Sequence, residues 1–205
     1  MKAHRAIPRF VSALLLLLLI GPALQSHAQS AVSQKITVHL DPAGTQIHWT
    51  LADPLHTVHG TFALKGGLIT IDPQTGMAQG EVIIDVTSGQ SGSPSRDRRM
   101  HRDVLESTKF PQAIFHPETV TGAIHPGTSQ NVTVKGTFTM HGSDHPLELP
   151  MAIQVTGKDA VATTHFAVPY VAWGMKDPSS ALIHVAKQVD VEVVAKGSVD
   201  GLPQP

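Results

Sequence analysis

The sequence predicts an all-β fold in which about eight antiparallel strands close into a barrel or fold over as a sandwich. Three features indicate it. Apolar and polar residues alternate with a period of two along most of the chain after residue 36, as in strands with one dry and one wet face. Short segments rich in Gly, Pro, Asp and Ser separate these runs. A single segment has the pattern of a helix, so the strands must bury their dry faces against one another.

Two of the predicted strands show the pattern most clearly. In the run at residues 45–51, Ile47, Trp49 and Leu51 share one face. In the last strand the valines at 189, 191 and 193 share the inward face. A closed barrel of about eight such strands can enclose one small ligand.

Prolines and glycines predict where the strands are interrupted. Pro117 interrupts the strand at 113–120, and Pro150 predicts an edge or a bulge because it cannot donate a ladder hydrogen bond. The Lys65-Gly66-Gly67 sequence predicts a turn between two strands.

The helix is predicted over residues 95–107, with Ser93 or Ser95 as its cap and Pro94 near its first position. Met100 and Val104 lie four residues apart and form a thin apolar stripe with Leu105. A stripe this thin does not make a core, so we expect the helix to lie across one end of the barrel. The basic run at 96–102 is most simply a solvated helix face.

The first 28 residues have the pattern of a secretory signal. Basic residues precede the apolar run at 10–20, which is too short to span a bilayer, and Ser26-His27-Ala28 offers small residues for cleavage. An uncleaved anchor is the alternative, which the Gly21-Pro22 break disfavours. Without cysteine, no lipid is attached through a thiol.

We therefore expect a periplasmic or secreted mature chain without stable insertion in the membrane. The expected divisions are a signal peptide at 1–28, a disordered segment at 29–35, the barrel domain at 36–199 and a polar tail at 200–205.

Composition argues against several functions. Removal of the three basic signal residues leaves 12 Lys and Arg against 16 Asp and Glu, a net charge of about −4. Nucleic-acid binding needs a basic face, so we do not expect it. The absence of cysteine excludes a thiol nucleophile and a thiolate metal site.

Five sequence motifs occur in a characteristic order. They are Val58-x-Gly60-x-Phe62, the Arg- and Asp-rich helix at 96–105, Phe110-Pro111 before a strand, the Gly136-Thr137-Phe138 strand ending in His141-Gly142, and Trp173-Gly174-Met175. In this order the chain resembles the YceI-like family of exported bacterial proteins, over nearly all of residues 36–197. The resemblance implies a lipocalin-like antiparallel β-barrel with one short helix at a barrel end, and an isoprenoid lipid held inside it. It implies lipid binding and does not imply catalysis.

An isoprenoid tail is hydrocarbon, so its site needs inward apolar side chains. Each buried carbon contributes about 0.8 kcal/mol, or roughly 4 kcal/mol per five-carbon unit before the costs of ordering. The expected ligand-binding residues are Trp49, Phe62, Ile84, Phe115, Phe138, Met140, Phe166 and Met175. The alternative is that these side chains fill a solid core.

Two other functions stay open. Thirteen histidines suggest a metal-binding module, with His56 and His59 three apart and His141 and His145 four apart, although neither pair lies in a helix. An envelope interaction or stress protein would use the barrel as a scaffold and the basic run at 96–102 as its contact surface. An enzyme is not expected, because the Gly89–Ser93 sequence lacks the spacing of a nucleophile elbow. No cofactor is predicted.

Overall fold

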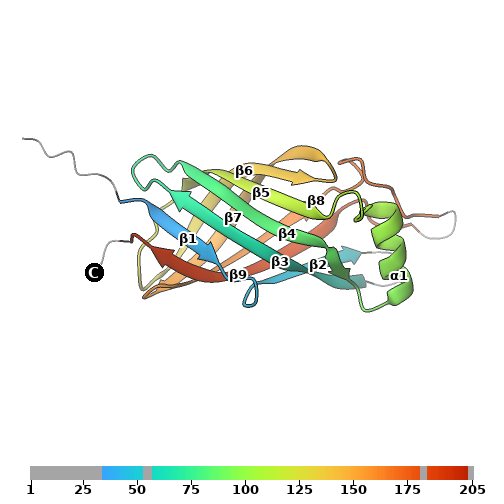
Figure 1. Cartoon of the computed structure of the whole chain (residues 1–205), viewed down its shortest axis with the longest axis horizontal. Coiled ribbons are helices and arrows are strands. Elements are labelled where there is room, and N and C mark those ends of the chain that lie inside the picture. The colour runs from blue at the N-terminus through green and yellow to red at the C-terminus, as the bar shows by residue number, and fades with distance from the viewer. Residues whose placement is uncertain (1–33, 53–56, 181–183, 203–205) are drawn as a thin grey trace, which may run out of the picture. The chain divides into compact units, whose positions relative to one another are not determined.

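The computed structural model describes residues 34–52, 57–180 and 184–202. These residues form nine strands and one short helical segment (Figure 1). The strands are β1 (Ile36–Leu40), β2 (Gln46–Ala52), β3 (Thr57–Ile71), β4 (Ala78–Gln90), β5 (Gln112–Thr121), β6 (Ser129–Met140), β7 (Ser143–Thr156), β8 (Asp159–Val168) and β9 (Val189–Asp200). The helical segment is α1 (Pro94–Arg99), continued by a π-helical turn, η1 (Met100–Val104).

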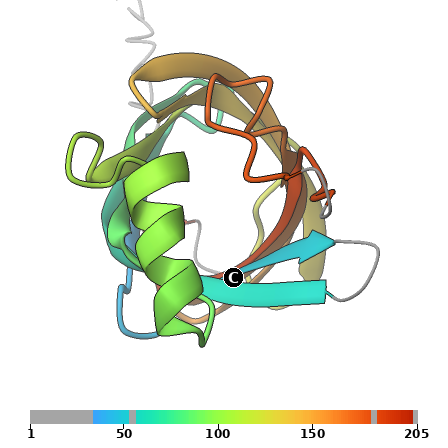
Figure 2. The same ribbon diagram turned by 90° about the vertical axis from the view of Figure 1, so that its right-hand side faces the viewer.

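All strand pairs are antiparallel, and the sheet closes on itself. Its order is β1-β3-β2-β9-β8-β7-β6-β5-β4, with additional pairing of β3 with β4 and of β1 with β9. Because β1 and β2 both lie between β3 and β9, nine strands occupy eight positions around the barrel. Figure 2 looks along the barrel and shows α1 across its end. The predicted all-β barrel with one short helix at an end is therefore confirmed.

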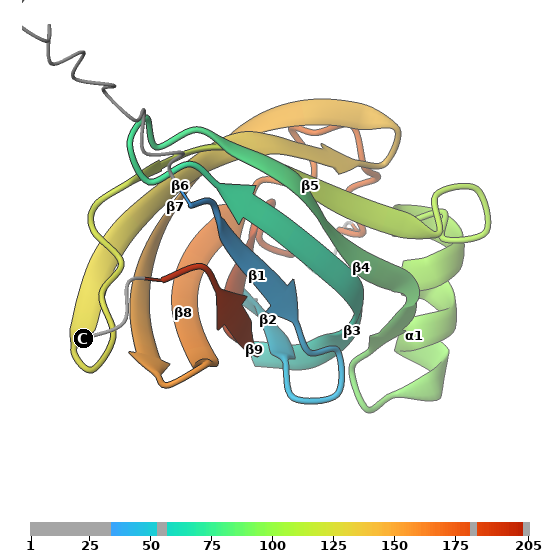
Figure 3. The same ribbon diagram turned by 60° about the vertical axis from the view of Figure 1, so that its left-hand side comes forward.

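β1 and β2 lie one after the other in the same place in the wall, between β3 and β9. β1 pairs with residues 68–71 of β3, whereas β2 pairs with residues 57–62 of the same strand. Figure 3 shows β1 between β3 and β9. Between β1 and β2, the Asp41 amide donates to the Lys196 carbonyl over 2.8 Å, and the Lys196 amide donates to Thr45 Oγ1 over 3.1 Å. The connection between β1 and β2, at residues 41–45, thus stays hydrogen-bonded to β9.

The predicted turn at residues 65–67 is wrong. β3 runs through it without reversal, and its register against β4 shifts between Leu64 and Gly66, which marks a β-bulge. Glycine serves close approach here: a Cβ on Gly67 would lie 2.6 Å from Leu40 Cδ1. A Gly-Gly pair is compatible with either a turn or a bulge. Here β3 pairs with β4 both before and after the two glycines, so the chain continues as one strand and forms a bulge.

The two prolines lie where strand pairing changes, as predicted. The register of β5 against β6 shifts between Pro117 and Thr119. Pro150 pairs with Thr133 of β6, and on its other side β8 pairs with β7 only from Met151 onward. The proline therefore lies where β8 and β7 part.

The helix begins at Pro94 as expected, but it is α-helical only to Arg99. Ser93 occupies the cap position, one of the two predicted, and its carbonyl accepts a hydrogen bond of 2.9 Å from the Asp97 amide, but its side chain makes no capping hydrogen bond. In η1 the Leu105 amide donates to the Met100 carbonyl over 2.9 Å, five residues back. The apolar stripe faces the barrel: Leu105 is buried, and Met100 packs partly buried against the core.

Candidate ligand-binding cavity

The interior of the barrel contains a cavity of about 250 Å³. Every strand contributes to its wall, and of the 37 lining residues all but Thr45 and Thr164 are apolar. The alternation along each strand produces this lining, because every second side chain points inward. A cavity with such walls favours a ligand made of hydrocarbon.

Inward side chains do not fill the interior. Across the described residues, only Val155 has a side chain less than 2% exposed. Val82, Ile84 and Val191 point into the cavity and remain half-buried rather than buried. In a close-packed core such residues lose nearly all their accessible surface to neighbours. The interior is therefore hollow.

The few polar groups in the lining are already occupied, with one exception. Thr164 Oγ1 donates to the Pro150 carbonyl over 2.7 Å, and Thr45 Oγ1 bonds to the backbone of Lys196. The indole N–H of Trp49 is buried and has no hydrogen-bond partner in the described part of the chain. The wall thus carries no charge and almost no means of recognising a polar group.

Seven of the eight side chains expected to bind ligand line this cavity. They are Trp49 on β2, Phe62 on β3, Ile84 on β4, Phe115 on β5, Phe138 and Met140 on β6, and Phe166 on β8. Met175 does not line it. Its side chain is 3% exposed, beyond the end of β8, and its amide donates to the Tyr170 carbonyl over 3.0 Å.

Residue-type reasoning missed the small residues of the wall. Ala113, Ala160, Ala162 and Ala195 all line the cavity, and Ala162 pairs in register with Ala195. Their small side chains leave space where larger ones would close it. The available signal was alanine at inward positions of the alternating pattern, which a search for large aromatic side chains passes over.

Trp49 owes its position to a glycine on the neighbouring strand. Trp49 is paired with Gly60 of β3, and a Cβ on Gly60 would lie 2.1 Å from Trp49 Cζ2. The indole therefore lies directly against the β3 backbone. Phe62, two residues further on, is 6.5 Å from the indole between ring centroids. The Val-x-Gly-x-Phe motif thus places two aromatic rings side by side in the wall.

One end of the barrel is closed by a second layer of side chains. We call the segments that form it the cap: residues 91–110, which include α1 and η1, and residues 169–180 and 184–188. Leu105, Tyr170 and Met175 of the cap are buried, and none of them lines the cavity. The Tyr170 hydroxyl donates to the Ala186 carbonyl over 2.7 Å. Burial, with a smaller contribution from the Asp177 carboxylate, raises the pKa of Tyr170 to about 12.

Beside the cap, the wall between β7 and β8 is incompletely hydrogen-bonded. The two strands pair from Met151 to Thr156, but residues 143–150 of β7 pair only with β6 and residues 165–168 of β8 only with β9. Trp173 of the cap stacks on His145 of β7, with ring centroids 4.0 Å apart and planes within 5°. Trp173 also lies 6.0 Å from Phe138. Side-chain contact thus replaces backbone pairing along this seam.

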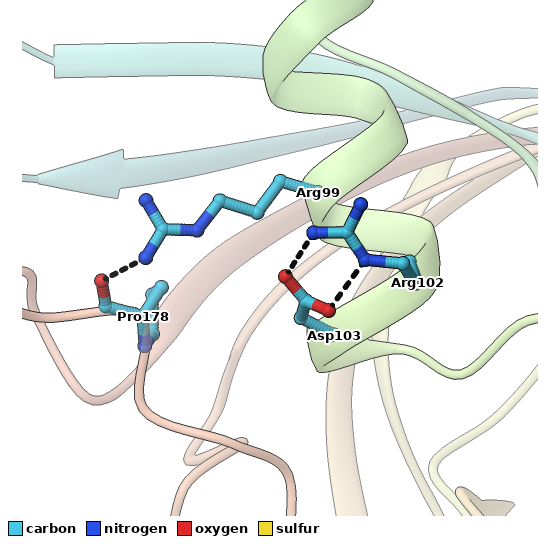
Figure 4. A network of polar contacts seen from close by, with 4 residues as sticks. All are labelled: Arg99, Arg102, Asp103 and Pro178. Atoms are coloured by element: carbon cyan, nitrogen blue, oxygen red, sulfur yellow. Dashed lines mark hydrogen bonds and ion pairs between the residues drawn. The ribbon is translucent and has the colours of Figure 1, made fainter.

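The outer face of the cap carries ion pairs and free cations. Arg102 donates two hydrogen bonds of 2.8 Å to the Asp103 carboxylate, and these bonds lower the pKa of Asp103 (Figure 4). Arg99 reaches across the cap and donates to the Pro178 carbonyl over 3.2 Å. The helix and the loop that follows β8 are therefore tied together at the surface.

The described histidines of the two pairs that sequence spacing suggested as metal ligands each contact a different partner. His59 Nδ1 lies 3.1 Å from Thr50 Oγ1, His141 Nε2 lies 2.8 Å from the Glu106 carboxylate, and His145 stacks on Trp173. His56 falls outside the described residues. Among the residues that the structure describes, no three His, Asp or Glu side chains come together as metal ligands would.

No helix in the described ranges has the length and apolarity needed to cross a bilayer. The sequence matches none of the curated proteins with which it was compared.

Solved structures share the architecture. A polyisoprenoid binding domain from Saccharophagus degradans implicated in plant cell wall breakdown is 14% identical, with a TM-score of 0.62 over 80% of this chain and 98% of its own. Burkholderia cenocepacia BcnA is 17% identical, with a TM-score of 0.62 over 77% and 98%. A Campylobacter jejuni YceI protein is 16% identical, with a TM-score of 0.56 over 70% and 86%. At these identities the likeness is one of fold. The family model of the YceI-like domain matches residues 39–196, which span nearly the whole barrel, and the chain belongs to that family.

Proposed function

We propose that the protein binds an apolar lipid, with an isoprenoid chain as the best candidate, inside its barrel. The observation that carries the proposal is the cavity inside the barrel, in which 35 of the 37 lining residues are apolar. The polyisoprenoid-binding neighbour from Saccharophagus degradans supports it, since that domain has the same fold. The eight predicted residues, Met175 included as part of the cap, are proposed to contact the ligand or close over it.

The size of the cavity limits how much hydrocarbon it accepts without rearrangement. A dry apolar cavity of about 150 Å³ accepts benzene, so 250 Å³ corresponds by proportion to about ten carbons, or two isoprenoid units. Burying ten carbons contributes about 8 kcal/mol before the costs of association. A longer tail must displace wall side chains or extend past the cap.

A polar head group on such a lipid is expected to stay outside. Both threonine hydroxyls in the wall already bond to the backbone, and the wall contains no charge. An ionised head group moved into this interior would lose its hydration without replacement, at a cost of several kcal/mol. Recognition therefore rests on the tail, and binding rather than catalysis is the proposed activity.

We further propose that the protein acts outside the cytoplasm, in the periplasm or after secretion, with residues 1–28 removed on export. The motif of a basic start, a short apolar run and Ser26-His27-Ala28 supports this. Intact mass measurement of protein from the exported fraction of expressing cells tests it: the expected chain begins at Gln29. A chain that keeps residue 1 contradicts the proposal.

The ligand is tested by solvent extraction of the purified protein and mass spectrometry of the extract. We expect an apolar lipid at a stoichiometry approaching one per chain. The comparison sample is an unrelated exported protein purified in parallel. Extracts that repeatedly contain no lipid above that background contradict the proposal.

A further inference from the structure

Positive charge is concentrated on the cap, although the chain as a whole is slightly acidic. The cap contains seven basic side chains against four acidic ones, whereas the rest of the described chain contains five against eleven. The seven are Arg96, Arg98, Arg99, Arg102, Lys109, Lys176 and Lys187. One end of the barrel is therefore basic and its walls are acidic.

All seven basic side chains of the cap are exposed. Of the four acidic side chains of the cap, Asp97, Asp103 and Asp177 are half-buried and Glu106 is exposed. The acidic ones are held back by hydrogen bonds or ion pairs: Asp97 accepts from the Ser91 amide over 2.9 Å, Asp177 from the Ser179 amide over 2.9 Å, and Glu106 lies 2.8 Å from His141 Nε2. Asp103 is occupied by Arg102. The surface that the cap presents outward is consequently cationic.

We propose that the cap docks on the surface of an anionic lipid bilayer and brings the capped end of the barrel to the membrane. This inference rests on the proposed function, because an apolar lipid is found in bilayers and not free in water. The seam between β7 and β8 lies at this same end, where only side-chain contacts close the wall. This seam can open while every pair of strands stays hydrogen-bonded. Docking at the capped end brings the seam to the bilayer, which is the source of the ligand.

The acidic walls fix the orientation and argue against nucleic acid as the partner. Eleven carboxylates on the rest of the described chain are repelled by any extended anion that wraps the barrel. A flat anionic surface meets the cap alone. Each basic residue near such a surface strengthens binding by about fivefold, and the attraction is screened within about 10 Å at 0.1 M salt.

Vesicle flotation tests the docking directly. The exported, processed protein is mixed with vesicles of phosphatidylcholine alone or with anionic phosphatidylglycerol added. We expect binding only to the anionic vesicles, loss of binding in about 1 M salt, and no competition by inorganic phosphate at matched ionic strength. Equal binding to both vesicle types, or none to either, overturns the proposal.

Two double variants distinguish an effect of the cap charges from an effect of the net charge of the protein. Arg98 and Lys176 make no hydrogen bond or ion pair within the described ranges, and Lys176 acts on the Asp103 carboxylate only at longer range, so R98Q/K176Q removes two cap charges without breaking a hydrogen bond or an ion pair. The matched control, K65Q/K196Q, removes the same charge from the walls. We expect the cap variant to bind anionic vesicles about 25-fold more weakly, with the control near wild type. Equal weakening by the two variants overturns the proposal.

Site-specific labels test the orientation. The chain has no cysteine, so S95C on the cap and Q74C in the turn before β4 each give one attachment point for a polarity-sensitive fluorophore. Anionic vesicles are expected to shift the emission of the label at 95 and not that at 74. The opposite pattern overturns the proposal. Lipid extraction from the same preparations reports separately on the proposed function, so failure of docking and failure of lipid binding are distinguished.

Discussion

At the scale of single residues, Gly60 sets the position of the largest side chain in the cavity wall. A methyl group added there would lie 2.1 Å from Trp49 Cζ2 and 2.3 Å from the Gln90 carbonyl oxygen. G60A must therefore move both the indole and a strand, and we expect it to lower the free energy of unfolding by about 1–3 kcal/mol. Denaturant unfolding measures the loss, and fluorescence in a W173F background reports the movement of Trp49 alone.

Gly66 provides the matched control on the same strand. A Cβ at Gly66 has no atom within 4 Å, and neither glycine needs a positive φ. We expect G66A to leave the free energy of unfolding within about 0.5 kcal/mol of wild type. If both substitutions cost the same, close contact with Trp49 is not the reason for Gly60.

Tyr170 makes the cap sensitive to high pH. Its pKa is raised to about 12 in the folded protein, chiefly by burial, so the unfolded chain loses the phenolic proton first, near pH 10. Between these values the unfolded state binds fewer protons, so stability is retained below pH 10 and falls as the pH rises to 12. We expect a loss on the order of 1–2 kcal/mol, below the value for the full shift because the cap touches water.

The chain has one tyrosine, so the ultraviolet absorbance of the phenolate reports this ionisation without overlap. Y170F is the control variant. It gives up the hydrogen bond to the Ala186 carbonyl, costing about 1 kcal/mol at neutral pH, and should remove this fall in stability above pH 10. A tyrosine that titrates near pH 10 in the folded protein contradicts the expectation.

At the scale of elements, alternation predicted the strands well and their pairing poorly. The side of each strand that faces inward follows from a period of two, and this placed Phe62, Phe115 and Phe166 in the wall. Alternation says nothing of depth along the barrel axis. Met175 was expected in the cavity because of its residue type, yet it lies in the cap.

Three local features depend on closure of the barrel and so were not predictable from neighbouring residues. The bulge at Gly66 follows from pairing with β4, and the conformation of residues 41–45, which connect β1 to β2, follows from their hydrogen bonds to β9. The parting of β7 and β8 at Pro150 is a third. Proline in the sequence indicates that pairing is weakened there, but not which neighbour departs.

The seam between β7 and β8 is held by Trp173, which leads to a kinetic prediction. W173A removes the stack on His145 and the contact with Phe138 while leaving every strand pair in place. We expect release of a bound fluorescent fatty or isoprenoid probe to accelerate by about tenfold, because aromatic contacts of this kind contribute about 0.5–1.5 kcal/mol. Stopped-flow transfer to acceptor vesicles measures the rate.

W173F is the control for the seam, since a phenyl ring keeps a stacked partner for His145. Its release rate should lie between those of W173A and wild type. If W173A releases the probe at the wild-type rate, the ligand leaves by another route.

At the scale of the whole molecule, closure of the sheet explains why the interior stays hollow. Eight wall positions enclose a space that large inward residues fill and small ones leave open. Here valines and alanines supply much of the lining, including Ala162 of β8 and Ala195 of β9, which are paired on neighbouring strands. The same closure pairs every strand with a neighbour on each side, except along the seam between β7 and β8, so most of the backbone hydrogen bonds are satisfied within the wall and do not depend on a packed centre.

Filling the cavity should therefore weaken binding strongly without unfolding the protein. A195F adds a phenyl ring to a space of about 250 Å³, and a cavity of about 150 Å³ is enough for benzene. The ring excludes about five ligand carbons, so we expect affinity to fall on the order of 10²–10³-fold while the ligand-free protein melts at the wild-type temperature or above. Lipid recovered on extraction and thermal unfolding after delipidation measure the two effects.

Two further variants make this test decisive. K196F places the same ring on the exposed face of the same strand and should leave lipid recovery unchanged. A162F fills the cavity from the paired strand, so it should reproduce the loss of lipid even if A195F distorts β9. Recovery of lipid from both filled variants at wild-type levels, with their folds intact, would mean that the ligand binds somewhere other than inside the barrel. Loss of lipid from K196F alone would instead place it on the outer wall.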